Sequence, residues 1–156
     1  MYDALAKGSS RPGAWGYALA FMRILHVADR LTDRGGAYTW MLGVIEALAA
    51  DHEVRLVVGE DDGAVTPPCP LDVRPGLESR EAAPVELDDL VEDFAPDLVH
   101  VHNLMNPTVL EWAASRPNAL LTVQDHRFFC PTRGKWTLGG VFCRRPMTRE
   151  ICASCF

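Results

Sequence analysis

Four of the five cysteines stand between residues 125 and 156 of this 156-residue chain, with twelve, eight and two residues between successive ones. A closing Cys-x-x-Cys pair is a spacing that a tetrahedral metal accepts, and zinc held by four thiolates would fix this segment. Buried free thiols and a disulfide are the alternatives. We therefore expect a structural zinc site at Cys130, Cys143, Cys152 and Cys155, with Cys69 standing apart from it.

A second set of polar residues stands at the ends of apolar stretches. His126, preceded by Asp125, follows the run ALLTV and could accept or donate a hydrogen bond near neutral pH. His102 and Asn103 end another apolar run. His100 and His102 alternate with valines, so both should face the same side of a strand, with His100 as a satisfied core residue.

Gly35 and Gly36 stand directly before a helical pattern. Unpaired backbone N–H groups at a helix start favour an anion, and glycine lets a phosphate or a sugar hydroxyl approach closely. A tight turn that needs a positive φ is the alternative interpretation. The dinucleotide fingerprint G-x-G-x-x-G is absent from this loop, which disfavours a dinucleotide site.

Strand and helix patterns alternate from residue 22 onward. On the first helix, Trp40, Met41, Val44, Ile45 and Leu48 recur at helical spacing and are predicted to be core. The predicted strands are 22–28, 53–59, 71–74, 97–102 and 119–124, and the predicted helices are 37–50, 84–94 and 106–115.

Short strands joined by helical crossovers predict an α/β fold, an open parallel sheet of Rossmann type with helices on both faces. Such sheets bind ligands at the carboxyl ends of their strands. The loops 29–36, 102–103 and 125–126 should therefore meet along one edge of the sheet. The Cys-rich segment 125–156 follows as a loop.

Charge is distributed unevenly along the chain. Residues 1–125 carry 9 Lys and Arg against 20 Asp and Glu, whereas residues 126–149 carry 6 basic residues and no acidic one. The acidic part argues against a nucleic-acid partner, and the basic segment either attracts phosphates or is simply solvated. No apolar run reaches the ~18 residues of a membrane span, so we expect a cytoplasmic protein. Residues 1–21 show no period and are predicted to be a disordered extension.

Four segments together resemble the amino-terminal half of family 4 glycosyltransferases. They are residues 22–29 (MRILHVAD), 34–37 (RGGA), 97–103 (DLVHVHN) and 122–131 (TVQDHRFFCP), and the resemblance extends over residues 22–156. It implies a two-domain GT-B enzyme that moves a sugar from a nucleotide diphosphate donor with retention of configuration and without a catalytic metal. It also implies a place in the cytoplasm, peripheral to the inner membrane face.

The resemblance also implies roles for particular residues. Gly35 and Gly36 would lie by the donor phosphates and the transferred sugar, and His126 would contact that sugar as the catalytic candidate. His102, Asn103 and Asp125 would serve substrate binding on the acceptor side.

The family's second domain, which binds the nucleotide, has no counterpart in residues 1–156. Residues 22–156 are therefore expected to be an incomplete GT-B amino-terminal domain, inactive without a second domain or chain. Its partners would be a nucleotide-sugar donor and a sugar or lipid-linked acceptor. One alternative is a non-catalytic α/β module that binds a glycan, a lipid phosphate or a protein; a small nucleotide-binding domain is another.

Overall fold

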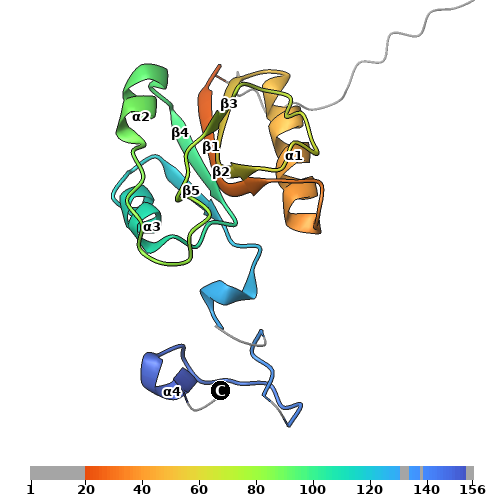
Figure 1. Cartoon of the computed structure of the whole chain (residues 1–156), viewed down its shortest axis with the longest axis vertical. Helices are drawn as coiled ribbons and strands as arrows, with labels where there is room; N and C mark the ends of the chain where they lie inside the picture. Colours follow the sequence, from red (N-terminus) through yellow and green to blue (C-terminus); the bar gives the residue numbers. More distant parts are fainter. Residues whose placement is uncertain (1–19, 131–133, 138, 154–156) are drawn as a thin grey trace, which may run out of the picture.

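The computed structural model describes residues 20–130, 134–137 and 139–153. Strands and helices alternate along these residues as the sequence predicts (Figure 1). The strands are β1 (Arg23–Leu31), β2 (Glu53–Asp61), β3 (Leu71–Val73), β4 (Leu98–His102) and β5 (Ala119–Thr122). The helices are α1 (Gly36–Ala49), α2 (Asp88–Phe94), α3 (Pro107–Ala114) and α4 (Arg149–Ala153), and η1 (His126–Phe128) is a 3₁₀ turn.

The strands form one five-stranded sheet in the order β3-β2-β1-β4-β5, with every neighbouring pair parallel. The chain thus builds outward from β1 to one side and then returns to the other side through β4. This arrangement confirms the predicted Rossmann-like α/β fold. The strand order reverses between β1 and β4, which is where such sheets bind ligands.

Two apolar layers, one on each face, hold the helices on the sheet. Alternate side chains of β1 point to opposite faces, so Leu25 and Val27 pack toward α2 and α3, whereas Ile24 and Ala28 pack toward α1. Figure 1 shows α1 on one face and α2 and α3 on the other. No described helix has the length and apolar character that crossing a bilayer requires.

Several sequence expectations differ from the structure, among them the ends of β2 and β5, which lie at Asp61 and Thr122. Strand β1 continues to Leu31, into the predicted loop. Helix α2 begins at Asp88 and not at Pro84, because Leu87 is already buried in the core before the helix starts. Trp40 is 45% exposed and was wrongly predicted to be core, since Met41 and Ile45 are the α1 residues that point fully into the sheet. The predicted disorder of residues 1–21 falls on residues of which 1–19 lie outside the described part.

Asn106 joins the start of α3 to a distant loop. Its side-chain oxygen accepts a hydrogen bond from the backbone N–H of Thr108 at 3.0 Å, which caps the helix. Its amide nitrogen donates to the carbonyl oxygens of Gly76 and Ala83, each at 2.9 Å. Asn106 is fully buried, so all these bonds are shielded from water. The loop between β3 and α2 is therefore fixed at two points.

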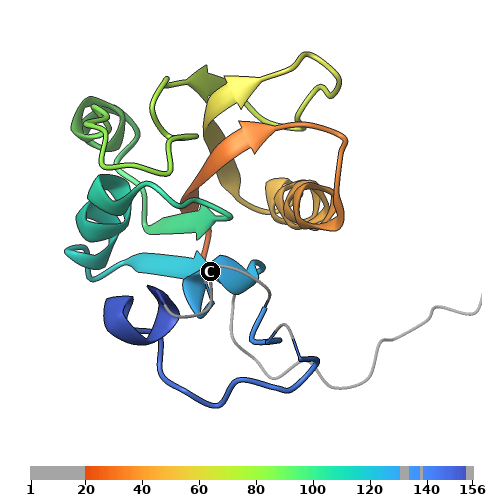
Figure 2. The same ribbon diagram turned by 60° about the horizontal axis from the view of Figure 1, so that its bottom comes forward.

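The described residues after β5 carry little regular structure. They contain η1, an isolated antiparallel bridge between Trp136 and Phe142, and α4. In Figure 2 η1 follows directly from the end of β5, so that it begins at the carboxyl edge of the sheet. This position brings the residues of η1 to the predicted ligand-binding edge.

Candidate functional site

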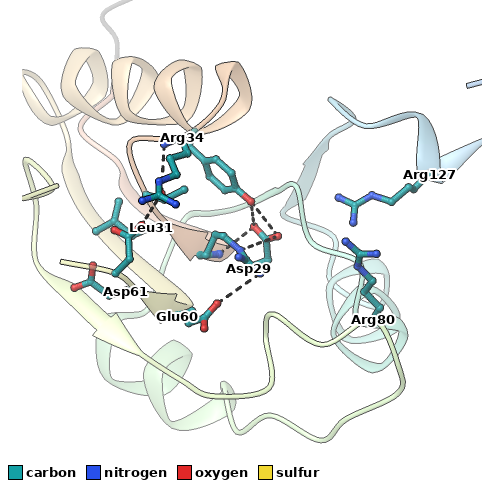
Figure 3. Close-up of a pocket in the computed structure, with 11 residues that line it drawn as sticks. Asp29, Leu31, Arg34, Glu60, Asp61, Arg80 and Arg127 are labelled. Atoms are coloured by element: carbon teal, nitrogen blue, oxygen red, sulfur yellow. Dashed lines mark hydrogen bonds and ion pairs between the residues drawn. The ribbon is translucent and has the colours of Figure 1, made fainter. Parts of the chain in front are cut away.

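A cavity of about 460 Å³ opens at the carboxyl ends of β1 and β2 (Figure 3). Residues from the first turn of α1, from the loop before α2 and from η1 complete its wall. Charged side chains dominate the lining, which consists of Asp29, Arg30, Leu31, Thr32, Arg34, Tyr38, Glu60, Asp61, Asp62, Arg80 and Arg127. Its place at the carboxyl ends of parallel strands is on the edge of the sheet where the fold predicts a ligand site.

Asp29 is the buried acid of this cavity. Burial raises the pKa of its carboxyl group, and the hydroxyl of Tyr38 counteracts part of this shift. That hydroxyl lies 3.1 Å from each carboxylate oxygen, and the backbone N–H of Arg30 donates to one of them at 3.0 Å. Burial and the Asp29 charge raise the pKa of Tyr38 to about 12. Tyr38 therefore stays protonated at neutral pH, and Asp29 is left with acceptor capacity toward the cavity.

Asn103 holds Tyr38 from the end of β4. Its side-chain N–H donates to the Tyr38 hydroxyl at 3.0 Å. Its backbone φ of 44° lies in the left-handed region, which asparagine adopts more readily than most residues. This sharp turn directly after β4 aims the side chain at α1. Asn103 thus reaches the site through Tyr38, and it is not itself part of the cavity wall.

Arg127 is the residue that η1 contributes to the wall of the cavity, and Asp125, which caps η1, holds it. The carboxylate of Asp125 accepts from the backbone N–H of Arg127 at 2.8 Å and pairs with its guanidinium at 2.7 Å. These hydrogen bonds lower the pKa of Asp125 and raise that of Arg127, so both groups remain charged. Arg127 lines the same cavity as Asp29. The loops after β1, β4 and β5 therefore converge as the sequence predicts.

The two glycines stand beside this cavity and not in its lining. Gly35 has a φ of 105°, so the tight turn before α1 needs glycine there. Gly36 opens α1, and a side chain added to it would meet no other atom within 4 Å. No side chain caps the start of α1. Backbone N–H groups are thus accessible here, between the cavity residues Arg34 and Tyr38.

His126 is half-exposed at the start of η1. Its Nδ1 atom lies 3.6 Å from an oxygen of Asp125, and its ring lies beside Gly134, where an added Cβ would come within 3.6 Å of the imidazole. The side chain is outside the cavity lining, although its neighbour Arg127 is part of it. Its contact with a transferred sugar stays a prediction.

A cluster of three histidines lies on the α1 face of the sheet. His26 Nδ1 and His102 Nε2 are 2.7 Å apart, and His100 Nε2 lies 2.7 Å from the hydroxyl of Thr122. Ring nitrogens of all three lie within 4.8 Å of one another, which makes this the one group of three potential ligands in the described part of the chain that could hold a metal ion.

Burial keeps these histidines uncharged. It lowers the pKa of His26 to about 3 and that of His102 to about 2, with a smaller contribution from His100, whose own pKa burial also lowers. The shared sheet face and the satisfied position of His100 agree with the sequence expectations. His102 is fully buried, so its role on the acceptor side stays a prediction. His26 was missed, because nothing in the sequence shows that β1 and β4 are neighbours with His26 opposite His100.

Three of the four predicted zinc ligands line a second, much smaller cavity. Cys130, Cys143 and Cys152 surround a space of about 30 Å³ together with Trp136 and Ile151. Cys155 lies outside the described residues. Cys69 packs against the core cluster beside α1, and burial raises the pKa of its thiol to about 11. The separation of Cys69 from the others agrees with the sequence expectation, and zinc binding stays a prediction.

The sequence did not single out Asp29, Tyr38, Arg80 or Arg127 as site residues. Asp29 and Arg127 carried a signal, because each stands at or next to a predicted strand end. Tyr38 resembles any helix residue in the sequence, and Arg80 lies in a loop whose path depends on Asn106.

Comparison with known proteins identifies the family. The profile of the glycosyl transferase 4-like domain matches residues 35–154, a stretch that contains α1, the strands β2 to β5 and the Cys-rich segment up to residue 154. Comparisons with curated proteins and with solved structures gave no significant match. The match agrees with the Rossmann-like sheet and with the resemblance seen in the sequence. This chain belongs to the glycosyl transferase 4-like domain family.

Proposed function

We propose that this chain is the acceptor-side domain of a retaining glycosyltransferase, which receives a sugar from a nucleotide diphosphate donor. The observation that carries the proposal is the 460 Å³ cavity at the ends of β1 and β2, in a chain of this family. Asp29 and the Tyr38 oxygen are fixed by hydrogen bonds and can accept hydrogen bonds from the hydroxyls of an acceptor. Because these protein groups are already in place, they would orient one hydroxyl of the sugar acceptor toward the donor.

The other predicted residues act around this cavity. We place Gly35 and Gly36 by the donor phosphates and the transferred sugar, supported by the uncapped start of α1. His126 contacts that sugar as the catalytic candidate. Asn103 acts by holding Tyr38, and Asp125 acts by holding Arg127.

The donor is held mainly by a second α/β domain, in the same or another chain, and transfer needs no divalent metal. Residues 1–156 alone then transfer sugar poorly or not at all, because the charge of the departing diphosphate is stabilised elsewhere. We place the protein in the cytoplasm, at the inner membrane face, where its acceptor is a sugar or a lipid-linked sugar. The unpaired thiols of Cys143 and Cys152 suit a reducing compartment.

We also propose that Cys130, Cys143, Cys152 and Cys155 hold a structural zinc ion. The three described cysteines line one cavity of about 30 Å³, which supports this. Their sulfur atoms are not close enough together to hold an ion as they stand, so zinc would draw the thiolates together. Thiolate sulfur is a preferred zinc ligand, and a closed four-sulfur site has no part in the chemistry.

The test is sugar transfer by the protein completed with its second domain, using a panel of nucleotide sugars. The variant His126→Ala should lower kcat by about 10²-fold with little change in the acceptor KM. The matched control His52→Ala, at a histidine in the turn before β2, should keep full activity. Unchanged turnover in His126→Ala would remove His126 from the mechanism. Acceptor binding without any transfer by the completed protein would favour the non-catalytic binding module.

A further inference from the structure

The cavity beside Asp29 has two chemically different sides. Glu60 and Asp61, at the end of β2, lie across the cavity from Arg80 and Arg127 (Figure 3). The acidic side is largely satisfied within the protein, because Arg30 pairs with Glu60 at 3.5 Å and Gly63 donates to Asp61 at 2.9 Å. The basic side faces the open space. A ligand in the cavity therefore meets the hydrogen-bond acceptors Asp29 and Tyr38 on one side, beside the lining residues Arg30 and Arg34, and meets Arg80 and Arg127 on the other side.

Arg80 and Arg127 come from segments that are far apart in the sequence, and their guanidinium groups point toward each other (Figure 3). Arg127 is tied to Asp125, whereas no ion pair of Arg80 occurs within the described part of the chain. Two like charges facing each other across a cavity are unfavourable unless an anion lies between them. The planar guanidinium fork is suited to phosphate, which it can bind through two parallel hydrogen bonds.

The positions of both arginines are built into the fold. The loop that carries Arg80 is tied to Asn106 at Gly76 and Ala83, so Arg80 lies between two anchored points. Arg127 is held by a side-chain and a backbone hydrogen bond to Asp125. Arg127 is thus held before any ligand arrives, which limits the entropy lost on binding, whereas the exposed side chain of Arg80 has only its backbone anchored.

We propose that Arg80 and Arg127 bind a phosphate group on the acceptor, so that the acceptor of this domain is a phosphorylated polyol. This inference rests on the proposed function and specifies its substrate. The phosphate lies between the two guanidinium groups, and the hydroxyls of the polyol reach Asp29 and Tyr38. The donor diphosphate, in contrast, is assigned to the uncapped start of α1 and the second domain.

The experiment is calorimetric titration of the chain at low ionic strength with glucose 6-phosphate, inorganic phosphate, glucose and UDP. Glucose 6-phosphate and phosphate should bind, and glucose should bind far more weakly. Arg80→Gln and Arg127→Gln should each weaken glucose 6-phosphate binding by about tenfold or more, the usual effect of losing hydrogen bonds to a charged group. Arg80→Lys should give an intermediate loss, because it keeps the charge without the fork.

The matched control is Arg74→Gln. Arg74 belongs to the same loop, but it pairs with Asp89 and lies outside the cavity lining. It should leave glucose 6-phosphate binding unchanged. Unfolding curves of all variants exclude misfolding as the cause of a loss. No binding of either phosphate, or equal binding by the Gln variants, would overturn the proposal. So would UDP binding more tightly than glucose 6-phosphate and depending on the same two arginines, which would assign the site to the donor.

The assay also separates this inference from the proposed function. Phosphate binding that depends on both arginines, combined with no sugar transfer by the completed protein, would keep the anion site and reject the enzyme. Transfer to a neutral acceptor that is unaffected by Arg80→Gln would keep the enzyme and reject the anion site.

Discussion

The hydroxyl group of Tyr38 lies 3.1 Å from both carboxylate oxygens of Asp29, so its single proton is shared between them. This contact joins the first helix to the end of the first strand at the floor of the cavity. Because the Asp29 carboxyl group is buried, it depends on its few remaining donors. Removal of the Tyr38 hydroxyl should therefore change both the free energy of unfolding and the pKa of Asp29.

We expect Tyr38→Phe to lower the free energy of unfolding by about 1–2 kcal/mol, the usual range for a lost buried hydrogen bond. The pKa of Asp29 should rise further, because the Tyr38 hydroxyl lowers it in the native protein. Urea unfolding and an NMR titration of the Asp29 carboxyl carbon measure the two effects. Thr39→Val, on the exposed side of the same helix, is the control and should change stability by less than about 0.5 kcal/mol. An unchanged Asp29 titration would contradict this role of Tyr38.

Stability should fall as the pH drops below about 6.5, the pKa of histidine in the unfolded chain. The folded-state pKa values of His26 and His102 are depressed to about 3 and about 2, so the unfolded state binds more protons between these values and 6.5. Each of the two histidines then lowers the free energy of unfolding by up to about 1.4 kcal/mol for each pH unit below 6.5. This loss is complete only near the pKa values of the folded state. Urea unfolding from pH 8 to pH 5 should show a plateau above pH 7 and a steep decline below 6.5.

The double variant His26→Leu/His102→Leu tests the source of this decline. It should flatten the pH dependence, whereas His126→Gln, which removes a half-exposed histidine, should leave the decline in place. An equally steep decline in the double variant would show that other groups are responsible.

Gly59→Ala should destabilise the protein by about 3 kcal/mol or more, at the upper end of the range for overpacking. A Cβ at this position of β2 would lie 2.5 Å from the backbone nitrogen of Glu78 and 2.8 Å from the carbonyl oxygen of Asp29, and neither backbone atom can move easily. Gly43→Ala is the control, because a Cβ there meets nothing within 4 Å on the exposed part of α1. That change should stabilise the protein by up to about 1 kcal/mol. Thermal unfolding of the two variants should move in opposite directions.

If zinc is bound by the four cysteines, the purified protein should contain one zinc ion per chain by elemental analysis. A chelator or Cys152→Ser should remove it and increase cleavage by protease in the Cys-rich segment, whose described residues 134–137 and 139–153 contain little regular structure besides α4. Cys69→Ser, in a residue remote from that cavity, should leave zinc content unchanged. Full zinc content and unchanged protease resistance in Cys152→Ser would contradict the site.

The fold could be predicted because its signals are local. The alternation of apolar strands with amphipathic helices, the Asn106 cap and the crossover rule together define a parallel sheet. The start of α2 could not be predicted from the sequence, since Leu87 is buried by tertiary packing before the helix begins. The prediction that Trp40 is core was wrong for the same reason. Helical spacing identifies one apolar face of the helix, but contact with the sheet determines which residues of that face are buried.

The site was predicted at the level of loops but not at that of side chains. The strand-end rule brought Asn103 and the start of η1 to the correct edge of the sheet. It could not show that Asn103 reaches the cavity through Tyr38, because this depends on a left-handed backbone turn. Arg80 could not be found either, since its position follows from hydrogen bonds between Asn106 and loop residues 23 and 30 positions upstream.

The side chain of Asn106 holds the loop at Gly76 and Ala83. Between these two points Leu77 is buried and Glu78 packs against Gly59 of β2, so only residues 80–82 are exposed. Relatives could carry different residues in this short stretch, and so present different side chains to an acceptor, without any change in the sheet or the helices. Differences in acceptor specificity within the family should therefore concentrate in this stretch. Asn106 should be retained, because it fixes the loop at Gly76 and Ala83.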